Sequence, residues 1–373
     1  MKDSKRKKIV MFVYGDITTD ARVQRAASTL SKNYELILLS NNWGKTLPES
    51  SYKNILIGKG SFDMKNYFMS ILQAYKIVKN ENPDVFYGHD YYSALLVKLL
   101  LGRKHCKKVV YDAHELYIPQ PGIPFTTRSR FFYKIEKSIV KKVDMMVCAN
   151  QERANKMMEH YGLKNCPTPI RNISQLKVND DSETSLILDS LEGFFNKPGI
   201  TVVYAGVVTT NRKVDDLASA VCVKPEKYKL LIVGKGNGID KVKQIVEQTP
   251  SLATALTGAV PYKSLGAILT KCDIGYIYYP VDTLNNIYCA SNKLYEYASV
   301  GLPMLSNENP TIKHTLETYG LGVATTDFQK GLDILSEGID TYKENCQQFT
   351  VNNQWYKEGE KLLTAIDELC KTI

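Results

Sequence analysis

The sequence predicts an α/β protein made of two Rossmann-like domains with parallel sheets. Apolar runs of strand length alternate with amphipathic segments of helical length, which is typical of parallel strands joined by crossover helices. The chain has 373 residues, a length that suits two domains of ordinary size better than a single core. An acidic and polar stretch interrupts the alternation once. We therefore expect a first domain, a linker, a second domain and a terminal segment at residues 1–176, 177–198, 199–350 and 351–373.

The individual elements follow from these runs in chain order. In the first half we expect strands at 8–14, 34–40, 54–58, 84–88, 107–113 and 144–149, with helices at 21–31, 64–80, 91–101 and 151–160. In the second half we expect strands at 199–206, 227–234, 253–258, 272–279 and 302–306, again separated by helices. Residues 354–370 have the period of a long amphipathic helix.

The composition indicates a globular protein of the cytosol. Hydrophobic residues make up 44% of the chain and charged residues 23%, which are ordinary values for such proteins. The eight cysteines are scattered and include no C-x-x-C pair, as expected for reduced thiols. The first apolar run is short and is not followed by a cleavage site, so we interpret it as a strand and not as a signal peptide. No apolar stretch approaches the length of a transmembrane helix.

The first half of the chain is strongly basic. Residues 1–179 contain 30 Lys and Arg against 15 Asp and Glu, whereas the remainder contains 18 against 24. In 127–142, Lys and Arg alternate with four apolar residues near helical spacing, Phe131, Phe132, Ile135 and Ile139. This pattern is typical of an interfacial helix on an anionic membrane, and it predicts a peripheral position at the inner face of that membrane. A core-facing helix with a solvated basic face explains it equally well, and no motif indicates a nucleic acid partner.

Glycine-rich turns follow two strands of the second half. In open parallel sheets ligands bind beyond the carboxyl ends of the strands. GKGNG (234–238) follows one such strand, but Ile239 stands where the dinucleotide fingerprint requires a third glycine. We therefore expect Gly234 and Gly236, together with Gly206 after the preceding strand, to line a nucleotide cleft that does not bind NAD.

The chain contains no Asp-x-Asp pair, and we predict neither a metal site nor a cofactor. Enzymes that hold a nucleotide-sugar diphosphate through Mg²⁺ or Mn²⁺ usually need paired carboxylates. A diphosphate bound here must therefore be neutralised by protein cations and helix N-termini. Arg212, at the head of the predicted helix 212–221, is placed to do so, although a water-exposed surface arginine explains it as well.

His114 emerges from a predicted strand between Asp112 and Glu115. An imidazole at a strand end can donate a hydrogen bond to a sugar hydroxyl or a phosphate, while a histidine satisfied within the fold is the alternative. Asp16 and Asp90 follow two other strands of the first half. With Asp112 and Glu115 they are our candidates for the acceptor side of a site.

SNKLYEYASVGLP (291–303) predicts a short helix with a carboxylate near its middle. Ser291 or Asn292 can cap its start, and Gly301, two residues before a proline, can end it. Glu296 lies among aromatic and small residues. A solvent-facing side chain is the simplest interpretation of a helical glutamate, and contact with a ligand is the alternative.

Together these segments resemble retaining glycosyltransferases of the GT-B fold, in particular glycosyltransferase family 4. DARVQRAASTL (20–30) resembles the first helix of that family, and PDVFYGHD (83–90) and KVVYDAHELY (108–117) resemble signatures of its acceptor-side domain. ALTGAVPYKSLGAILTKCDIGYIYYP (255–280) and NKLYEYASVGLP (292–303) resemble its nucleotide-sugar half. The resemblance implies sheets that face each other across a cleft and a terminal helix that returns to the first domain.

The resemblance also implies donor-binding residues. Glu296 matches the second glutamate of the family's Glu-x7-Glu motif, which holds the donor ribose, and Tyr288 replaces the first. Arg212 matches a phosphate-binding lysine. Lys293 is our candidate to replace the charge of a companion arginine, whose position Val207 occupies. Ser291 and Asn292 lie at the helix start that suits the diphosphate.

Two residues of the first domain complete the site that the resemblance implies. Gly15 matches a glycine that lets the donor phosphates or the acceptor approach the backbone. His114 matches the histidine that contacts the transferred sugar, so the implied catalytic set is His114, Arg212 and Glu296. Domain closure is expected to bring the two halves of this set together and to exclude water.

The function implied is that of a metal-independent, retaining hexosyltransferase in surface polysaccharide synthesis. It would move a sugar from a nucleotide-diphosphate sugar to a saccharide or lipid-linked saccharide, with the leaving phosphate assisting deprotonation of the acceptor. One alternative is a nucleotide-sugar 2-epimerase of the same fold, which should carry more carboxylates and histidines at its cleft. The other is a catalytically silent relative that binds an active partner, an interpretation that Tyr288 supports.

Overall fold

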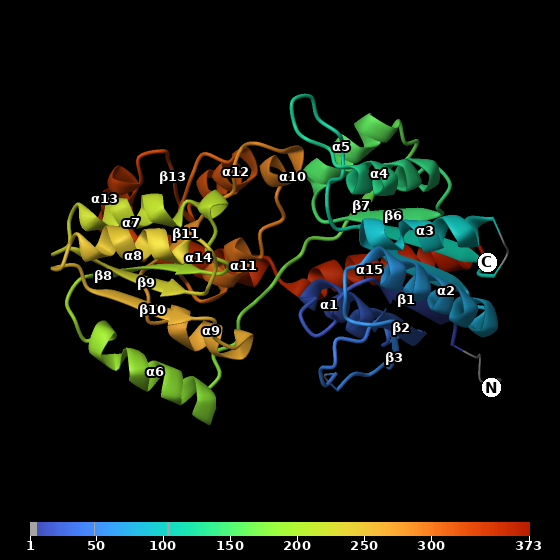
Figure 1. The fold of residues 1–373 in the computed structure, drawn as a ribbon, viewed down its shortest axis with the longest axis horizontal. Helices are drawn as coiled ribbons and strands as arrows, with labels where there is room; N and C mark the ends of the chain where they lie inside the picture. Colours follow the sequence, from blue (N-terminus) through green and yellow to red (C-terminus); the bar gives the residue numbers. More distant parts are fainter. Residues whose placement is uncertain (1–5, 48, 103–104) are drawn as a thin grey trace. The chain divides into compact units, whose positions relative to one another are not determined.

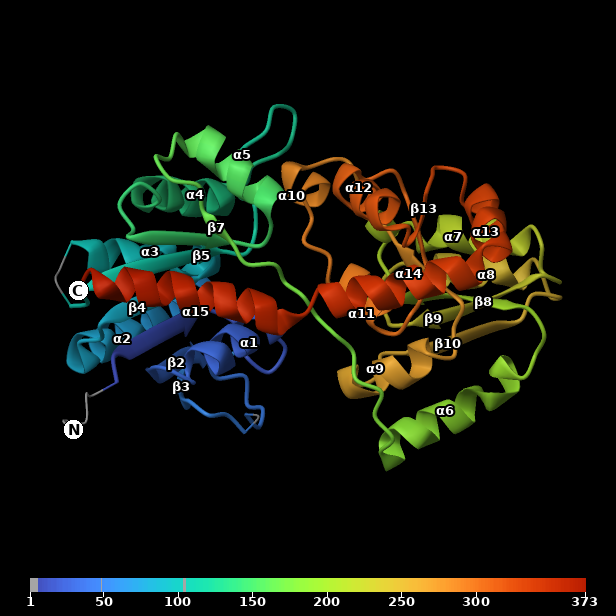
Figure 2. The same ribbon diagram turned by 180° about the vertical axis from the view of Figure 1, so that it is seen from behind.

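The structure, a computed structural model, describes residues 6–47, 49–102 and 105–373. It divides into two compact units. The first comprises the chain up to Asn172 together with Trp355–Ile373, and the second comprises Ile173–Gln354. Each unit carries one parallel sheet with helices against it (Figures 1 and 2), so the predicted α/β class with two Rossmann-like domains is confirmed.

The sheet of the first unit has the strand order β3-β2-β1-β4-β5-β6-β7. Its strands are β1 (Lys8–Val13), β2 (Glu35–Asn41), β3 (Lys53–Ile57), β4 (Val85–His89), β5 (Lys108–Ala113), β6 (Met145–Cys148) and β7 (Thr168–Pro169). Its helices are α1 (Ala21–Leu30), α2 (Met64–Glu81), α3 (Asp90–Leu101), α4 (Thr127–Ile139), α5 (Gln151–Tyr161) and α15 (Trp355–Lys371).

Helices cover both faces of this sheet. On one face α2, α3 and α4 form a layer in which α3 contacts both neighbours, and on the other α1 packs against α15 (Figures 1 and 2). Met11 of β1 shares a core with Val23 of α1 and with Leu362 and Ile366 of α15. This shared core explains why the last helix of the chain belongs to the first unit.

The sheet of the second unit has the order β10-β9-β8-β11-β12-β13. Its strands are β8 (Ile200–Ala205), β9 (Tyr228–Val233), β10 (Thr254–Gly258), β11 (Ile274–Ile277), β12 (Met304–Ser306) and β13 (Gly322–Ala324). Its helices are α6 (Ser182–Phe195), the 3-10 turn η1 (Thr210–Arg212), α7 (Val214–Cys222), α8 (Ile239–Glu247), α9 (Tyr262–Leu269), α10 (Leu284–Ile287), α11 (Asn292–Ser299), α12 (Pro310–Tyr319), α13 (Phe328–Glu337) and α14 (Ile339–Asn352).

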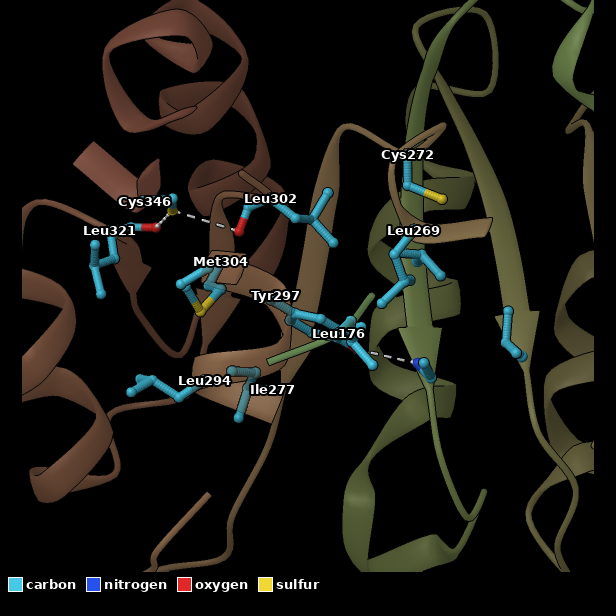
Figure 3. Packing of buried hydrophobic residues seen from close by; sticks show 14 of the residues in the cluster. Leu176, Leu269, Cys272, Ile277, Leu294, Tyr297, Leu302, Met304, Leu321 and Cys346 are labelled. Atoms are coloured by element: carbon cyan, nitrogen blue, oxygen red, sulfur yellow. Dashed lines mark hydrogen bonds between the residues drawn. The ribbon is translucent and has the colours of Figure 1, made fainter. Parts of the chain in front are cut away.

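Helix α11 packs on this sheet through one apolar face. Leu294 and Tyr297 lie in a buried cluster with Ile277 of β11 and Met304 of β12 (Figure 3). Their spacing of three residues matches one face of an α-helix. Because this face is fixed against the core, Glu296 is directed away from it.

The domain boundaries differ from the sequence prediction. Residues 177–198 are not a linker, because α6 forms within them and buries Leu191 and Phe194 in the core of the second unit. Asp181 starts this helix by accepting a hydrogen bond from the backbone N–H of Thr184. The division of the chain falls at Asn172–Ile173. At the other end α14 continues to Asn352, so the terminal segment begins at Trp355 and not at 351, and its helix α15 starts within one residue of the predicted start at 354.

The short edge strands β7 and β13 are absent from the sequence prediction, because runs of two and three residues carry no readable period. In the described ranges of the chain, every helix is too short or too polar to cross a bilayer.

Candidate functional site

A cavity of about 490 Å³ lies at the carboxyl ends of the strands in the second unit. Its walls come from the turns after β8 and β9, from the segment between β10 and α9, and from the start of α11. The lining residues are Ala205, Gly206, Val207, Val233, Gly234, Lys235, Ala259, Val260, Tyr262, Leu265, Tyr279, Ala290, Asn292, Lys293 and Glu296. This is the position at which open parallel sheets bind ligands.

Two predicted glycines form a backbone wall of this cavity. Gly206 and Gly234 have φ angles of 140° and 148°, which side chains rarely adopt. A Cβ on Gly234 would lie 1.9 Å from the carbonyl oxygen of Gly206, and one on Gly206 would lie 2.9 Å from Nζ of Lys293. Backbone contact therefore excludes a side chain at Gly234, and the φ angle disfavours one at Gly206. Gly236 meets a similar restriction, 2.1 Å from the Val208 oxygen, but it lies outside the cavity lining.

The carboxylate of Glu296 lines the cavity and is only 8% exposed. The interpretation as a solvent-facing glutamate is therefore wrong. Its Oε1 accepts a hydrogen bond of 2.9 Å from the hydroxyl of Tyr262. That hydroxyl also lies 2.7 Å from Oγ of Ser174. Since Tyr262 donates its only proton to Glu296, Ser174 is the donor in the second contact.

Lys293 brings a positive charge to the cavity. Its Nζ lies 5.4 Å from the centroid of the Tyr204 ring. Burial and the Arg212 guanidinium lower the pKa of Lys293 to about 8, against the opposing attraction of Glu296. The ammonium is therefore mostly protonated at neutral pH, but it is destabilised by its surroundings. An anionic ligand would relieve this destabilisation.

Arg212 adjoins the cavity without lining it. Its Nη1 donates to the Tyr278 carbonyl at 2.8 Å, and its guanidinium lies 4.3 Å from the centroid of the Tyr279 ring, which does line the cavity. The sequence predicted that Arg212 begins a helix, but in the structure this residue ends η1. The helix α7 starts only at Val214, because Lys213 has a φ of 50°. Arg212 is thus held by the segment that follows β11.

The start of α11 is open to a ligand. Ser291 occupies the N-cap position, but its side chain makes no capping hydrogen bond. Oγ of Ser291 and Oδ1 of Asn292 are buried and have no hydrogen-bond partner within the described structure. Buried polar atoms are normally paired, and the first N–H groups of a helix favour an anion. Tyr288, by contrast, follows α10 and is outside the cavity lining.

A second polar cluster is buried in the first unit, at the ends of β4 and β5. Asp112 is 1% exposed, and its Oδ1 accepts a hydrogen bond of 2.8 Å from Nη2 of Arg22. Its Oδ2 accepts the Tyr87 hydroxyl at 3.1 Å and lies 3.5 Å from Nδ1 of His89 and 3.8 Å from Nε2 of His114. Burial alone would raise the pKa of Asp112, but Arg22 and His89 lower it far below its usual range. Asp112 is therefore part of an internal network of the first unit.

The protons of the two histidines can be assigned from this network. Nδ1 of His89 and Nε2 of His114 are 3.1 Å apart, while Nε2 of His89 is buried without a partner. A buried lone pair without a partner costs less than a buried N–H, so we place the His89 proton on Nδ1. His89 then donates to His114, whose own proton must be on Nδ1. Burial lowers the pKa of His114 to about 4, so its ring is neutral at physiological pH.

His89, Asp112 and His114 also have the composition of a metal site, with one ligand atom from each lying within 4.8 Å of the others. Two observations fit a metal poorly. A metal-bound histidine normally donates its second N–H to a partner, and Nε2 of His89 has none. The Arg22 guanidinium also places a positive charge beside Asp112. The hydrogen-bonded network fits these residues better.

The other predicted acidic residues of the first unit, all of which the structure describes, have no hydrogen bond to Asp112. Asp90 has a φ of 60°, and its Oδ1 is buried without a partner. Burial, with a contribution from Glu115, raises its pKa well above the usual range. Glu115 itself is exposed, 3.7 Å from Arg153. Asp16 accepts from the backbone and the hydroxyl of Thr18 and so stabilises its own turn.

Gly15 is not required by packing within the first unit. A Cβ there would have Val13 at 3.9 Å as its only near neighbour, and its φ is not positive. Sequence reasoning missed Tyr262, Tyr279, His89, Arg22 and Tyr87. His89 had a readable signal, because it precedes Asp90 at the end of a predicted strand.

The comparisons with known proteins concern the family and the fold. Residues 21–172 match the family model described as Glycosyltransferase Family 4. Sucrose-phosphate synthase from Thermosynechococcus elongatus is similar in structure, with a TM-score of 0.76 and 13% identity over 99% of this chain and 100% of that one. Anabaena Alr3699/HepE in complex with UDP and glucose is similar with a TM-score of 0.71 and 12% identity, over 98% and 100% of the two chains.

WaaG, a glycosyltransferase involved in lipopolysaccharide biosynthesis, is also similar, with a TM-score of 0.70 and 13% identity over 96% of this chain and 99% of that one. None of the curated proteins compared with the chain matches it in sequence. The fold is that of the GT-B glycosyltransferases, and the predicted resemblance to this fold and to glycosyltransferase family 4 is confirmed, while retention of configuration stays a prediction.

Proposed function

We propose that the protein is a glycosyltransferase that takes its sugar from a nucleotide-diphosphate sugar. The observation that carries this proposal is the cavity of the second unit, where a buried carboxylate, an ammonium and the open start of a helix converge. Anabaena HepE, which has a similar fold, binds UDP-glucose. WaaG, another protein of similar fold, is a glycosyltransferase, and the family model that matches residues 21–172 describes glycosyltransferases as well.

Each part of the donor has a chemical counterpart in this cavity. Glu296 offers acceptor oxygens to the vicinal hydroxyls of a ribose, and the Tyr262 hydroxyl holds the carboxylate in place. Lys293 and the first N–H groups of α11 suit the diphosphate. Arg212 supplies a second cation next to the cavity. We propose that these groups neutralise the diphosphate without a metal ion.

The same groups favour the transition state over the bound donor. As the anomeric bond breaks, negative charge accumulates on the leaving diphosphate, and fixed cations and N–H groups stabilise the charge that develops. Lys293 can take part in both states, because its ammonium is destabilised in the empty cavity and any anionic diphosphate relieves that destabilisation. We propose that His114 and Gly15 act on the sugar side of the donor, that configuration is retained, and that the leaving phosphate accepts the proton of the acceptor hydroxyl. The proposed acceptor is a saccharide or lipid-linked saccharide of surface polysaccharide synthesis.

A turnover assay with a panel of nucleotide sugars tests this proposal. Purified protein is incubated with UDP- and GDP-sugars, with and without saccharide acceptors. The products are identified by mass spectrometry, and the anomeric configuration is determined by NMR. We expect a glycosidic product with retained configuration, formed equally well in EDTA. Isomerised free donor would instead identify an epimerase. Tight nucleotide binding without turnover would identify a silent relative.

A further inference from the structure

The outward face of α2 combines exposed apolar side chains with lysines. Phe68, Met69 and Leu72 are 43%, 43% and 59% exposed. Lys65, Lys76 and Lys79 are exposed on the same side of the helix, as its period of 3.6 residues requires. The opposite side is buried in the first unit through Tyr67, Ile71, Ala74 and Val78. Large apolar side chains are thus grouped on a surface where the fold does not need them.

Helix α4 extends this surface. Its Phe131 is 37% exposed, and the ring centroid lies 6.4 Å from that of Phe68. The same helix carries four exposed cations, Arg128, Arg130, Lys134 and Lys137. The one acidic residue of α4, Glu136, is fully buried, and its carboxylate accepts hydrogen bonds from the hydroxyls of Tyr111 and Tyr161. We call the exposed residues of these two helices the α2–α4 surface.

The α2–α4 surface has almost no negative charge. Throughout α2 and α4, both of which the structure describes in full, the acidic residues are Glu81 and Glu136. Glu81 ends α2 and pairs with Lys8, and Glu136 is buried. Asp63, next to the surface, caps the start of α2. The two helices therefore carry seven exposed cations and four exposed apolar side chains, without exposed acidic neighbours on the same helices.

Two kinds of anionic partner fit the cations, but only one fits the apolar side chains. A nucleic acid is held through its phosphates by Lys and Arg and offers nothing to Met69 and Leu72. An anionic bilayer offers phosphates to the cations and acyl chains to the apolar side chains. We propose that the α2–α4 surface docks the protein on an anionic lipid bilayer, with Phe68, Met69, Leu72 and Phe131 inserted below the headgroups.

The geometry changes the sequence interpretation of 127–142. Phe132, Ile135 and Ile139 are buried, so α4 is a core-facing helix with a solvated basic face, and only Phe131 is exposed. The apolar part of the surface comes from α2. The donor cavity is in the other unit. A negative result for membrane docking would therefore leave the proposed catalytic function unaffected, and a negative result for catalysis would leave the docking proposal unaffected.

Sedimentation of the full-length protein with lipid vesicles tests the proposal. Vesicles of phosphatidylcholine with about one third phosphatidylglycerol should bind the protein, and pure phosphatidylcholine vesicles should not. The triple variant Phe68→Ser, Met69→Ser, Leu72→Ser and the double variant Lys76→Glu, Lys79→Glu should each lower the partition coefficient by roughly tenfold or more. Circular dichroism and UDP or GDP binding should match the wild type in both variants.

Matched controls come from the second unit. Leu186, which is 70% exposed, and Lys243, which is exposed on α8, lie outside the α2–α4 surface. Leu186→Ser and Lys243→Glu should leave vesicle binding unchanged. A Phe68→Trp variant should show a blue-shifted emission on anionic vesicles, quenched by brominated acyl chains. Failure of the wild type to bind anionic vesicles, equal losses in the controls, or an unshifted tryptophan in the bound protein would overturn the proposal, as would stronger binding to duplex RNA at the same salt concentration.

Discussion

The hydroxyl of Tyr262 donates a 2.9 Å hydrogen bond to the carboxylate of Glu296, and both side chains line the same cavity. The two residues come from α9 and α11 and are separated by β11 in the chain. A carboxylate that is 8% exposed is costly unless it is paired. The tyrosine reduces this cost and fixes the direction in which the carboxylate meets a ligand.

Replacing Glu296 should weaken donor use without unfolding the protein. For Glu296→Gln we expect kcat/KM for the donor to fall by about 100-fold, because hydrogen bonds to a charged group contribute about 1.5–3 kcal/mol. Tyr262→Phe should cost only a few fold, since it removes the support and not the contact. The wild type should bind the ribonucleoside diphosphate more tightly than its 2′-deoxy analogue, and Glu296→Gln should bind both alike. Undiminished discrimination in that variant would place the ribose elsewhere.

Lys293 should make donor binding depend on pH. Its pKa is lowered to about 8, and the diphosphate requires the protonated form, so affinity measured by calorimetry should fall as the pH rises through about 8. Lys293→Met should lower the affinity at pH 7 and remove this dependence. A binding curve that is flat from pH 7 to pH 9.5 in the wild type would contradict the assignment.

The same lowered pKa predicts that Lys293 lowers the free energy of unfolding of the unliganded protein. Between about 8 and the unfolded value of 10.5 the unfolded chain binds more protons at this position, so the free energy of unfolding should rise with pH in that window. Below pH 8 the cost is fully present. Lys293→Met should therefore stabilise the unliganded protein at pH 7 by about 1–3 kcal/mol in urea unfolding. A destabilised variant would show that the charge is better compensated than the structure indicates.

The network around Asp112 predicts the tautomers of two histidines. In long-range ¹H–¹⁵N spectra of histidine-labelled protein, His89 and His114 should both carry their proton on Nδ1. His114 should stay neutral to about pH 4, since burial lowers its pKa. This pKa is below the unfolded value of 6.5, so its contribution to stability should be lost as the pH falls from 6.5 towards 4. An Nε2 proton on His114, or stoichiometric zinc in the purified protein, would contradict the network.

The buried pair of Arg22 and Asp112 should matter far more to stability than an exposed pair. Arg22→Met leaves a buried carboxylate without its cation and should cost about 3–5 kcal/mol in urea unfolding. The matched control is Lys45→Met. Lys45 pairs with Asp16, and its side chain is 53% exposed. That change should cost about 0–1 kcal/mol. Equal effects of the two variants would mean that the Asp112 network relaxes or takes up water.

Much of the fold could be predicted because its signals are local. The long strands are apolar runs, and the helix from Asn292 to Ser299 has a serine at its N-cap position, an apolar face and a glycine after its end. Helix α6 was missed because its residues look like an acidic linker, and only the sheet of the second unit gives Leu191 and Phe194 something to pack against. The edge strands β7 and β13 are too short to show a period.

The site divides in the same way. Glu296, Lys293 and the glycines lie next to strands or in a helix with a recognisable pattern, so their neighbourhood could be anticipated. Tyr262 could not, because its partner is 34 residues away and no local pattern links them. The pairing of Asp112 could not be anticipated either. Its position at a strand end made it a candidate for the acceptor side, and its contact with Arg22, 90 residues away, follows only from the tertiary structure.

Crystals of the full-length protein grown with UDP, and separately with GDP, test the central claim most directly. One of the two nucleotides should occupy the cavity of the second unit, with its ribose hydroxyls bonded to the Glu296 carboxylate and its diphosphate at the start of α11 beside Lys293. A nucleotide bound at another site, with this cavity empty and Glu296 bonded only to the protein, would contradict the account.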